Sequence, residues 1–245
     1  MMDLLVDIGN SRLKWALSEN GRLQSGSPIV HREPDFAAQL DSAWRDIPRQ
    51  PARMAISSVG SNSVLERVVE NAKAVWPMIE IVIPQSEACR YGVENGYVYP
   101  ERLGVDRWLC LIAAHHAFRS PVCIVDCGTA LTVDVLDGNG KHRGGVICPG
   151  LSMMKHSLYH GTTNLALIDQ HYSLGIAQTT ESAIYSGTLY AATGLVMTIL
   201  MQQEPTYDLV ITGGDADLIA RHIDRKATIC PELIMKGLSI VLAGS

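Results

Sequence analysis

The sequence predicts an α/β protein of two similar halves, each a mixed β-sheet covered by helices. Three observations lead to this prediction. A buried strand ends in an Asp-x-Gly turn twice, once at Asp7 and once at Asp126. Each turn is followed by a strand, an Asn-Gly hairpin and another strand, and Asn-Gly is a strong short-range signal for a β-hairpin. Helical and strand patterns then alternate in both halves, which predicts a mixed sheet covered by helices.

The two halves share one register. In both, the Asn of the hairpin follows the aspartate of the turn by 13 positions. An offset of 119 positions therefore relates the halves, and it carries Gly9 onto Gly128. The same offset carries Gly26, after the first hairpin, onto Gly145. Agreement over this length indicates a repeated unit.

The elements of the first half follow from periodicity and turn residues. Apolar runs bounded by turns predict strands, and apolar residues spaced for one helix face predict helices. In order we expect a strand over 4–10, a hairpin over 11–26, a helix over 35–47, a strand over 53–60, a helix over 61–76 capped by Ser61 or Asn62, and a strand over 80–85. Residues 86–100, rich in Gly and Tyr, predict a bridge between the halves, and 104–118 a helix that leads into the second half.

The second half begins with the repeated unit and continues with helices and strands. We expect a strand over 122–129, a hairpin over 131–145, a helix over 180–203, a strand over 207–214, a helix over 215–223 and an apolar end over 231–244. The pattern therefore predicts two domains, 1–115 and 116–245, with the boundary near residue 115.

Composition argues against nucleic acids and membranes as binding partners. Of the 245 residues 47% are hydrophobic, enough for a substantial core, and 18% are charged, with a formal net charge of −5. Because no broad basic surface is available, we expect no nucleic-acid partner. The N-terminus has no basic segment, and apolar stretches such as 194–200 are too short to cross a membrane, so we expect a cytoplasmic protein without membrane contact.

The repeated turns suit phosphate binding. Glycine after a strand leaves backbone N–H groups unhindered, and two similar halves create a cleft where such groups can meet a nucleotide. The carboxylates of Asp7 and Asp126 suit Mg²⁺ or a monovalent cation, and Lys14 is a point charge for a phosphate. One Asp-x-Gly alone favours an ordinary turn, but two in register, with the later Gly213-Gly214 pair, favour nucleotide binding. The Walker A and protein-kinase motifs are absent from the sequence.

Six segments together resemble the motifs of type III pantothenate kinases, in the order of that family. They are DIGNSRLK (7–14), GVDRW (104–108), DCGTALTVD (126–134), GGVICPGL (144–151), TTESAIYSG (179–187) and ITGGDA (211–216). The family belongs to the superfamily of actin, hexokinase and acetate kinase, so the resemblance implies a duplicated actin-like (ribonuclease H-like) fold with a nucleotide cleft between its domains. It also implies ATP-dependent phosphorylation of pantothenate to 4′-phosphopantothenate, the first step of coenzyme A biosynthesis. The family works as a homodimer with Mg²⁺ and a monovalent cation, K⁺ or NH₄⁺.

The resemblance also implies roles for single residues. ATP contacts are implied for Asp7, Gly9, Asn10, Ser11, Lys14 and Thr129. Substrate contacts are implied for Tyr97, Gly104, Val105, Asp106, Arg107 and Thr180, with Asp106 as the catalytic base. The monovalent cation is implied to bind Asp126. Two positions depart from the usual residues, because Ser11 stands where many relatives have Thr and Cys127 replaces a small residue.

The chemistry of transfer to an alcohol needs the same residue types at Asp106 and Arg107. A hydroxyl is a weak nucleophile, and a positioned carboxylate that accepts its proton is worth about 10²- to 10⁴-fold in rate. A guanidinium pairs with the carboxylate of pantothenate better than an ammonium does. The alternative for this pair is an ordinary first helix turn, with Asp favoured by the helix dipole and Arg in solvent. Tyr97 has an alternative as well, as a loop aromatic that covers the core.

Two other functions stay open beside the pantothenate kinase. One is a kinase for another small hydroxyl or carboxylate substrate, since a fold does not determine an acceptor. The other is a nucleotide-binding actin-like regulatory or accessory protein without turnover. The helix over 180–203 is apolar on more than one face, which favours burial either in its own domain or in a homodimer.

Overall fold

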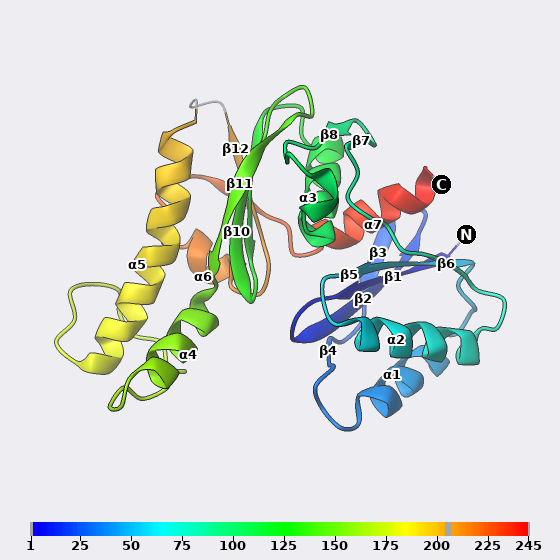
Figure 1. Cartoon of the computed structure of the whole chain (residues 1–245), viewed down its shortest axis with the longest axis horizontal. Helices are drawn as coiled ribbons and strands as arrows, with labels where there is room; N and C mark the ends of the chain where they lie inside the picture. The colour runs from blue at the N-terminus through cyan, green and yellow to red at the C-terminus, as the bar shows by residue number, and fades with distance from the viewer. Residues whose placement is uncertain (1, 204–206, 245) are drawn as a thin grey trace. The chain divides into compact units, whose positions relative to one another are not determined.

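The computed structural model describes residues 2–203 and 207–244, and it divides into two compact units. Unit 1 consists of Met1–His116 and Glu232–Ser245, and unit 2 of Ala117–Pro231. Each unit has one main β-sheet with helices packed on it (Figure 1). The α/β class predicted from the sequence is therefore confirmed.

The main sheet of unit 1 has the strand order β3-β2-β1-β5-β6, with β4 paired to β2. Its strands are β1 (Met2–Ile8), β2 (Arg12–Glu19), β3 (Arg22–Ser25), β4 (Ile29–Val30), β5 (Arg53–Ser58) and β6 (Glu80–Val82). The first three pair antiparallel, whereas β1, β5 and β6 are parallel. Asn20 and Gly21 have φ values of 51° and 76°, the left-handed conformation that a two-residue hairpin turn requires, which confirms the predicted Asn-Gly hairpin.

Helices cover both faces of this sheet (Figure 1). They are α1 (Phe36–Arg45), α2 (Asn62–Val75), α3 (Val105–Ala117) and α7 (Leu233–Ala243). Leu4, Val6 and Ile8 of β1 pack into one core cluster with side chains of α1 and α2. Because successive side chains on a strand point to opposite faces, Leu5 and Asp7 lie on the other face.

The C-terminal helix α7 packs on unit 1, whereas the sequence analysis assigned the chain end to the second half. It contacts β1, β2 and β5. Arg53 of β5 explains part of this attachment, because it donates to the carbonyl oxygen of Leu242 at 2.6 Å and pairs with Asp3 at 3.0 Å. A Cβ atom on Gly237 would collide with the backbone of Leu109, so α7 also approaches α3 closely. The apolar pattern of the segment predicts burial but does not identify the sheet that provides it.

The bridge over 86–100 contains a small hairpin that the sequence analysis missed, β7 (Cys89–Arg90) with β8 (Val93–Glu94). Buried Asn95 then organises the loop that carries Tyr97. Its side chain accepts from the backbone N–H of Tyr97 at 3.0 Å and donates to the carbonyl oxygen of Pro100 at 3.1 Å. A short 3₁₀ turn, Pro100–Arg102, leads into α3.

Unit 2 repeats the strand order of unit 1, as β11-β10-β9-β12-β13. Its strands are β9 (Val122–Cys127), β10 (Ala130–Leu136), β11 (His142–Pro149), β12 (Asp208–Thr212) and β13 (Ala227–Ile229). Again three strands are antiparallel, and β9, β12 and β13 are parallel. The duplication inferred from the 119-position offset is therefore present in the topology.

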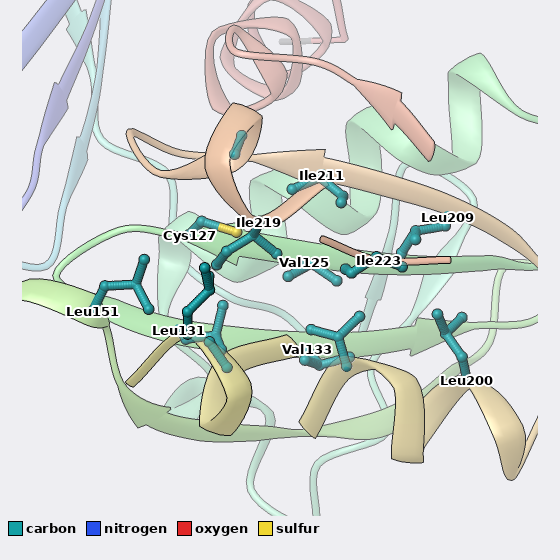
Figure 2. Close-up of a cluster of buried hydrophobic side chains, with 14 of the residues drawn as sticks. Val125, Cys127, Leu131, Val133, Leu151, Leu200, Leu209, Ile211, Ile219 and Ile223 are labelled. Carbon is teal, nitrogen blue, oxygen red and sulfur yellow. The ribbon is translucent and has the colours of Figure 1, made fainter. Parts of the chain in front are cut away.

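The described residues of unit 2 form the helices α4 (Leu151–Gly161), α5 (Thr180–Met201) and α6 (Ala216–Ala220). The sequence analysis missed α4. Val125, Leu131 and Val133 of the sheet meet α5 and α6 in one core cluster, in which Figure 2 shows Leu200 and Ile219 pointing toward the strands. Asp126, between Val125 and Cys127, lies on the face of β9 opposite this cluster.

The expectation that no segment is long and apolar enough to span a membrane is wrong for α5. By length and composition its 22 residues satisfy that criterion, although half of its most apolar window is buried inside unit 2. Leu189, Ala192 and Val196 are part of the core cluster. The helix is therefore a core element of unit 2, and this burial explains its apolar composition.

Candidate active site

Asp7 lies buried at the carboxyl end of β1, in the centre of the unit 1 sheet. Lys14 is directly opposite on β2, and Ser57 is its partner on β5. Burial raises the pKa of Asp7 to about 6, partly opposed by the nearby Lys14 and reinforced by the charge of Asp106. Its Oδ1 atom is buried and makes no hydrogen bond within the described parts of the chain. A buried carboxylate oxygen in that state is suited to a cation.

The loop after β1 is partly exposed. The N–H group of Gly9 donates to the carbonyl oxygen of Arg12 at 3.1 Å, which closes the turn. A Cβ atom on Gly9 would meet only that oxygen, at 3.4 Å, and the residue does not have a left-handed φ. The backbone conformation therefore does not require glycine here, and the space beside its Cα is open except for that oxygen. Asn10 is exposed and Ser11 half-buried.

Asp106 and Arg107 begin α3 together with Val105. The backbone N–H of Arg107 donates to Oδ1 of Asp106 at 2.8 Å, which holds this carboxylate at the helix start. A Cβ atom on Gly104 would lie 2.5 Å from the same oxygen, so glycine is needed there for the carboxylate to take this position. Because the charge of Asp106 raises the pKa of Asp7, the structure brings these two predicted site residues near each other within unit 1.

Arg107 is buried, so the alternative in which its side chain extends into solvent is wrong. Only 5% of the residue is exposed. Its Nη1 atom donates to the hydroxyl of Tyr97 at 2.6 Å, and its guanidinium carbon lies 5.4 Å from the centre of the Tyr97 ring. The structure therefore joins Tyr97 and Arg107, which are 10 positions apart, in one group beside Asp106.

The second loop follows β9 in unit 2. Asp126 is half-buried, and its register partners are Thr132 on β10 and Thr212 on β12. Gly213 has a φ of 93°, and a Cβ atom there would lie 2.5 Å from Oδ1 of Asp126. Glycine at this position therefore leaves room beside the carboxylate. Thr129 is exposed, one residue after Gly128.

A small cavity of about 150 Å³ lies in unit 2 between the starts of α4 and α6 and the side of α5. It is lined by Leu151, Ser152, Lys155, His171, Tyr185, Thr188, Leu189, Asp215 and Leu218. Burial raises the pKa of Asp215, while Lys155 and His171 oppose this shift. The backbone N–H of Asp215 donates to the carbonyl oxygen of Cys127 at 3.0 Å, which ties the cavity to the second loop.

Lys155, His171 and Asp215 line this cavity but were not predicted as site residues from the sequence. Lys155 lies on the helix that the analysis did not predict, and His171 lies in an irregular segment between α4 and α5. Only Asp215 had a signal, since it directly follows the Gly213-Gly214 pair. Thr180 is the exposed first residue of α5. Among the described residues, no group of three or more His, Cys, Asp or Glu side chains is arranged to hold a metal ion by itself.

The comparisons with known sequences lead to the same family. The family model described as "Type III pantothenate kinase" matches residues 3–202. The type III pantothenate kinase of Nitrosococcus oceani is 36% identical over 98% of this chain and 93% of its own length. That of Laribacter hongkongensis is 38% identical over 97% of each chain.

Solved structures show the fold. A Baf family protein from Campylobacter jejuni matches with a TM-score of 0.62 and 23% identity over 98% of both chains. The activator of the 2-hydroxyisocaproyl-CoA dehydratase from Clostridium difficile, with bound ADPNP, matches with a TM-score of 0.56 and 11% identity over 98% of this chain and 94% of that one. The fold is the duplicated actin-like ATPase fold.

Proposed function

Because the chain belongs to the type III pantothenate kinase family, we propose how its own residues serve that reaction. The reaction is the ATP-dependent phosphorylation of pantothenate in coenzyme A biosynthesis, and it requires ATP with a divalent metal. One group of residues in unit 1 supports this assignment. It consists of buried Asp7, Asp106 and the Arg107–Tyr97 pair.

The first loop and Asp7 bind the phosphates of ATP together with Mg²⁺. The donor set fits this ion, since Oδ1 of Asp7 is a buried carboxylate oxygen without a hydrogen bond in the described residues. Mg²⁺ usually takes one or two carboxylates and completes its shell with phosphate oxygens and water, so a larger protein cluster is not needed. When bound, the ion neutralises charge on the phosphates. Gly9, Asn10 and Ser11 supply backbone and hydroxyl contacts, and Lys14 supplies a positive charge.

Asp106 accepts the proton of the pantothenate hydroxyl as that oxygen bonds to the γ-phosphorus and ADP leaves. Its carboxylate is positioned for this task by the N–H of Arg107 and by the bare Cα of Gly104. Arg107 binds the carboxylate of pantothenate. A guanidinium has five N–H donors, and the bond to Tyr97 uses one of them while fixing the plane of the group. Val105 and Gly104 line the same helix start.

Unit 2 has its own predicted residues for ATP and for a monovalent cation. We assign Thr129 and the cavity between α4 and α6 to ATP, and Asp126 to K⁺ or NH₄⁺. The strand partner of Asp7 on β2 is a lysine, whereas Asp126 lies between two threonines in the strand register. A carboxylate such as that of Asp126 is a suitable oxygen ligand for a large, weakly hydrated cation.

The working unit is a homodimer in the cytoplasm, without nucleic-acid or membrane partners. Small residues form one exposed face of α5, namely Ala183, Gly187, Ala191, Gly194 and Thr198. Tyr190 beside them is 48% exposed. A face of small residues allows another helix to approach closely, which supports a contact between copies through α5, near Thr180. Sedimentation or light scattering that gives a monomer at assay concentration would contradict this assignment.

The test of the function is an assay of ADP release with ATP, Mg²⁺ and pantothenate, with phosphopantothenate identified by mass spectrometry. Asp106→Asn should lower kcat by on the order of 10²- to 10⁴-fold with ATP affinity nearly unchanged. Glu101→Gln, which changes an exposed carboxylate in the same segment, is the matched control and should keep turnover. Near-normal turnover of Asp106→Asn would exclude it as the base. Turnover of hexoses or short acids in place of pantothenate would exclude the substrate.

The cation is tested by exchanging K⁺ for Na⁺ or Tris. Rates should fall in K⁺-free buffer and recover on addition of K⁺ or NH₄⁺, and Asp126→Ala should remove this response. Asp217→Asn, an exposed carboxylate on α6, is the control and should respond as the wild type does. Full activity of the wild type without K⁺ would exclude the site.

A further inference from the structure

His31 lies behind the first phosphate loop, although nothing in its sequence pattern indicates a role there. It follows β4, which pairs with the start of β2 through Arg12 and Val30. The residue is 8% exposed, and its ring meets Phe36 edge to face, with the centroids 6.3 Å apart. Its Nε2 atom lies 2.9 Å from the carbonyl oxygen of Gly9. Because a carbonyl oxygen only accepts, Nε2 carries the hydrogen and donates it.

This bond determines the direction in which the next amide points. A trans peptide is planar, with its C=O and N–H groups pointing to opposite sides. The carbonyl of Gly9 points inward to His31, and it also lies against Gly60, where a Cβ atom would be 3.2 Å from the same oxygen. The N–H of Asn10, on the other side of this peptide, therefore points away from the packed side of the loop. It faces the side on which an incoming phosphate can accept it.

The internal repeat gives an independent reason to connect His31 with the loop. The offset of 119 positions that carries Gly9 onto Gly128 carries His31 onto Gly150. Gly150 follows β11 and holds the second loop from behind, because its N–H donates to the carbonyl oxygen of Thr129 at 2.9 Å. A Cβ atom on Gly150 would collide with the carbonyl oxygen of Gly128, the counterpart of Gly9. The two halves thus support their loops from the same position, one with a side chain and one with the backbone.

We propose that His31 is a positioning residue of the kinase, which fixes the peptide between Gly9 and Asn10 so that the Asn10 amide is directed at a phosphate of ATP. This rests on the proposed assignment of the first loop to ATP. His31 acts through Gly9 and touches no reacting atom. Its loss therefore weakens nucleotide binding and leaves the pantothenate site, formed from Tyr97 and Arg107, unchanged.

Three substitutions separate the hydrogen bond from the bulk of the ring. His31→Phe keeps a ring but has no donor, His31→Gln places an amide N–H near the position of Nε2, and His31→Asn has the same amide one methylene shorter, where it does not reach Gly9. His116→Phe is the matched control, since Nε2 of His116 donates to the backbone carbonyl of Tyr91 at 3.1 Å, at the last turn of α3. If His31→Phe does not fold, the Gln and Asn pair still decides the question.

The readouts are the dissociation constant of a non-hydrolysable ATP analogue, by calorimetric titration without pantothenate, and the separate KM values for ATP and pantothenate. We expect Phe and Asn at position 31 to weaken analogue binding and raise the KM for ATP by about tenfold, with the KM for pantothenate unchanged, and Gln to restore most of the loss. His116→Phe should bind the analogue as the wild type does. Wild-type affinity in His31→Asn, or equal loss in Gln and Asn, would overturn the proposal. Wild-type protein that binds the analogue but does not phosphorylate pantothenate would instead overturn the proposed function.

Discussion

The two strand-end loops occupy the same place in the repeat but differ in their chemistry. Asp7 is buried between Lys14 and Ser57, and its pKa is raised to about 6, whereas Asp126 is half-buried between two threonines. The first loop is supported from behind by an imidazole, and the second by a backbone N–H. The repeat thus conserves strand order and turn position, while the neighbours of each carboxylate have diverged.

The topology and the site therefore depend on different residues. The inward-facing residues of β1 and β9 build the two cores and lie on the face opposite the aspartates. The strand partners of the aspartates therefore lie outside these two core clusters, and they differ between the loops in charge. Lys14 lies opposite the carboxylate of the first loop. For the carboxylate of the second loop, Asp126, we propose K⁺ or NH₄⁺ from solution.

The largest effect is expected from Asp7→Asn, which tests whether the first carboxylate is retained for function at a cost in stability. We expect kcat/KM for ATP to fall by on the order of 100-fold, because a neutral amide is a poor ligand for Mg²⁺. The substitution should at the same time stabilise the protein at pH 8 by about 2–3 kcal/mol, since it removes a buried charge. Activity assays and denaturant unfolding on the same preparations measure the loss of activity and the gain in stability.

The pH dependence of this gain has a definite sign. The pKa of Asp7 is raised from 3.8 to about 6 on folding, so between these values the folded protein holds a proton that the unfolded chain has released. The stability contributed by Asp7 therefore falls as the pH rises through this window, and the advantage of Asp7→Asn should vanish near pH 3. Asp3→Asn on the same strand is the control, and it should destabilise, because Asp3 pairs with Arg53. Loss of stability in Asp7→Asn at pH 8 would contradict the buried-charge account.

The next effect concerns two glycines, Gly213 beside Asp126 and Gly9 in the first loop, whose substitution should have opposite consequences. Gly213→Ala should destabilise unit 2 by about 2–4 kcal/mol, because the residue has a φ of 93° and its Cβ atom would lie 2.5 Å from both Asp126 and the Cys127 carbonyl. Gly9→Ala should change stability by less than about 1 kcal/mol and weaken binding of an ATP analogue, since its Cβ atom meets only ordinary contacts in the protein. Thermal unfolding and analogue titration separate the two. Wild-type affinity in Gly9→Ala would show that this turn is merely structural.

Much of the fold could be predicted from the sequence, because hairpin turns and helix faces are local patterns. The repeated Asp-x-Gly and Asn-Gly turns gave the order of the first three strands in each unit. The docking of α7 on β5 could not be predicted in this way, since it depends on the long-range bond from Arg53 to the carbonyl oxygen of Leu242. The short hairpin β7–β8 has only two residues in each strand, too few for a periodic signal.

The candidate site was predictable only in part, and for a physical reason. Strand ends and a helix start mark Asp7, Asp126 and Asp106, so their places follow from secondary structure. The burial of Arg107 against Tyr97 depends on the loop that Asn95 organises, and no local pattern predicts it. The same holds for His31, which reaches Gly9 from 22 positions away.

The two Asn-Gly hairpins are alike in sequence but differ in structure. Substitutions in their turns should have the smallest effects. In unit 1 both Asn20 and Gly21 have positive φ, so the turn is specified by the backbone alone. In the turn of the unit 2 hairpin, Gly140 has a positive φ but Asn139 does not. That turn is held by Asp137, whose Oδ1 accepts from the N–H groups of Asn139 and Lys141 at 2.9 Å each.

Asp137→Ala should therefore destabilise the protein by about 1–2 kcal/mol at pH 7, because two backbone donors lose their acceptor, and Asn20→Gly by only a few tenths of a kcal/mol. Burial alone would raise the pKa of Asp137, but the hydrogen bonds from Lys141 and Asn139 and the charge of Arg143 hold it below the ordinary value. A carboxylate with a lowered pKa contributes stability that is present above the pKa of the unfolded chain and lost as the pH falls through the folded value. The difference between wild type and Asp137→Ala, measured by urea unfolding, should accordingly shrink below pH 4, while that for Asn20→Gly stays constant. Equal and pH-independent losses in both variants would show that the two hairpins are held in the same way.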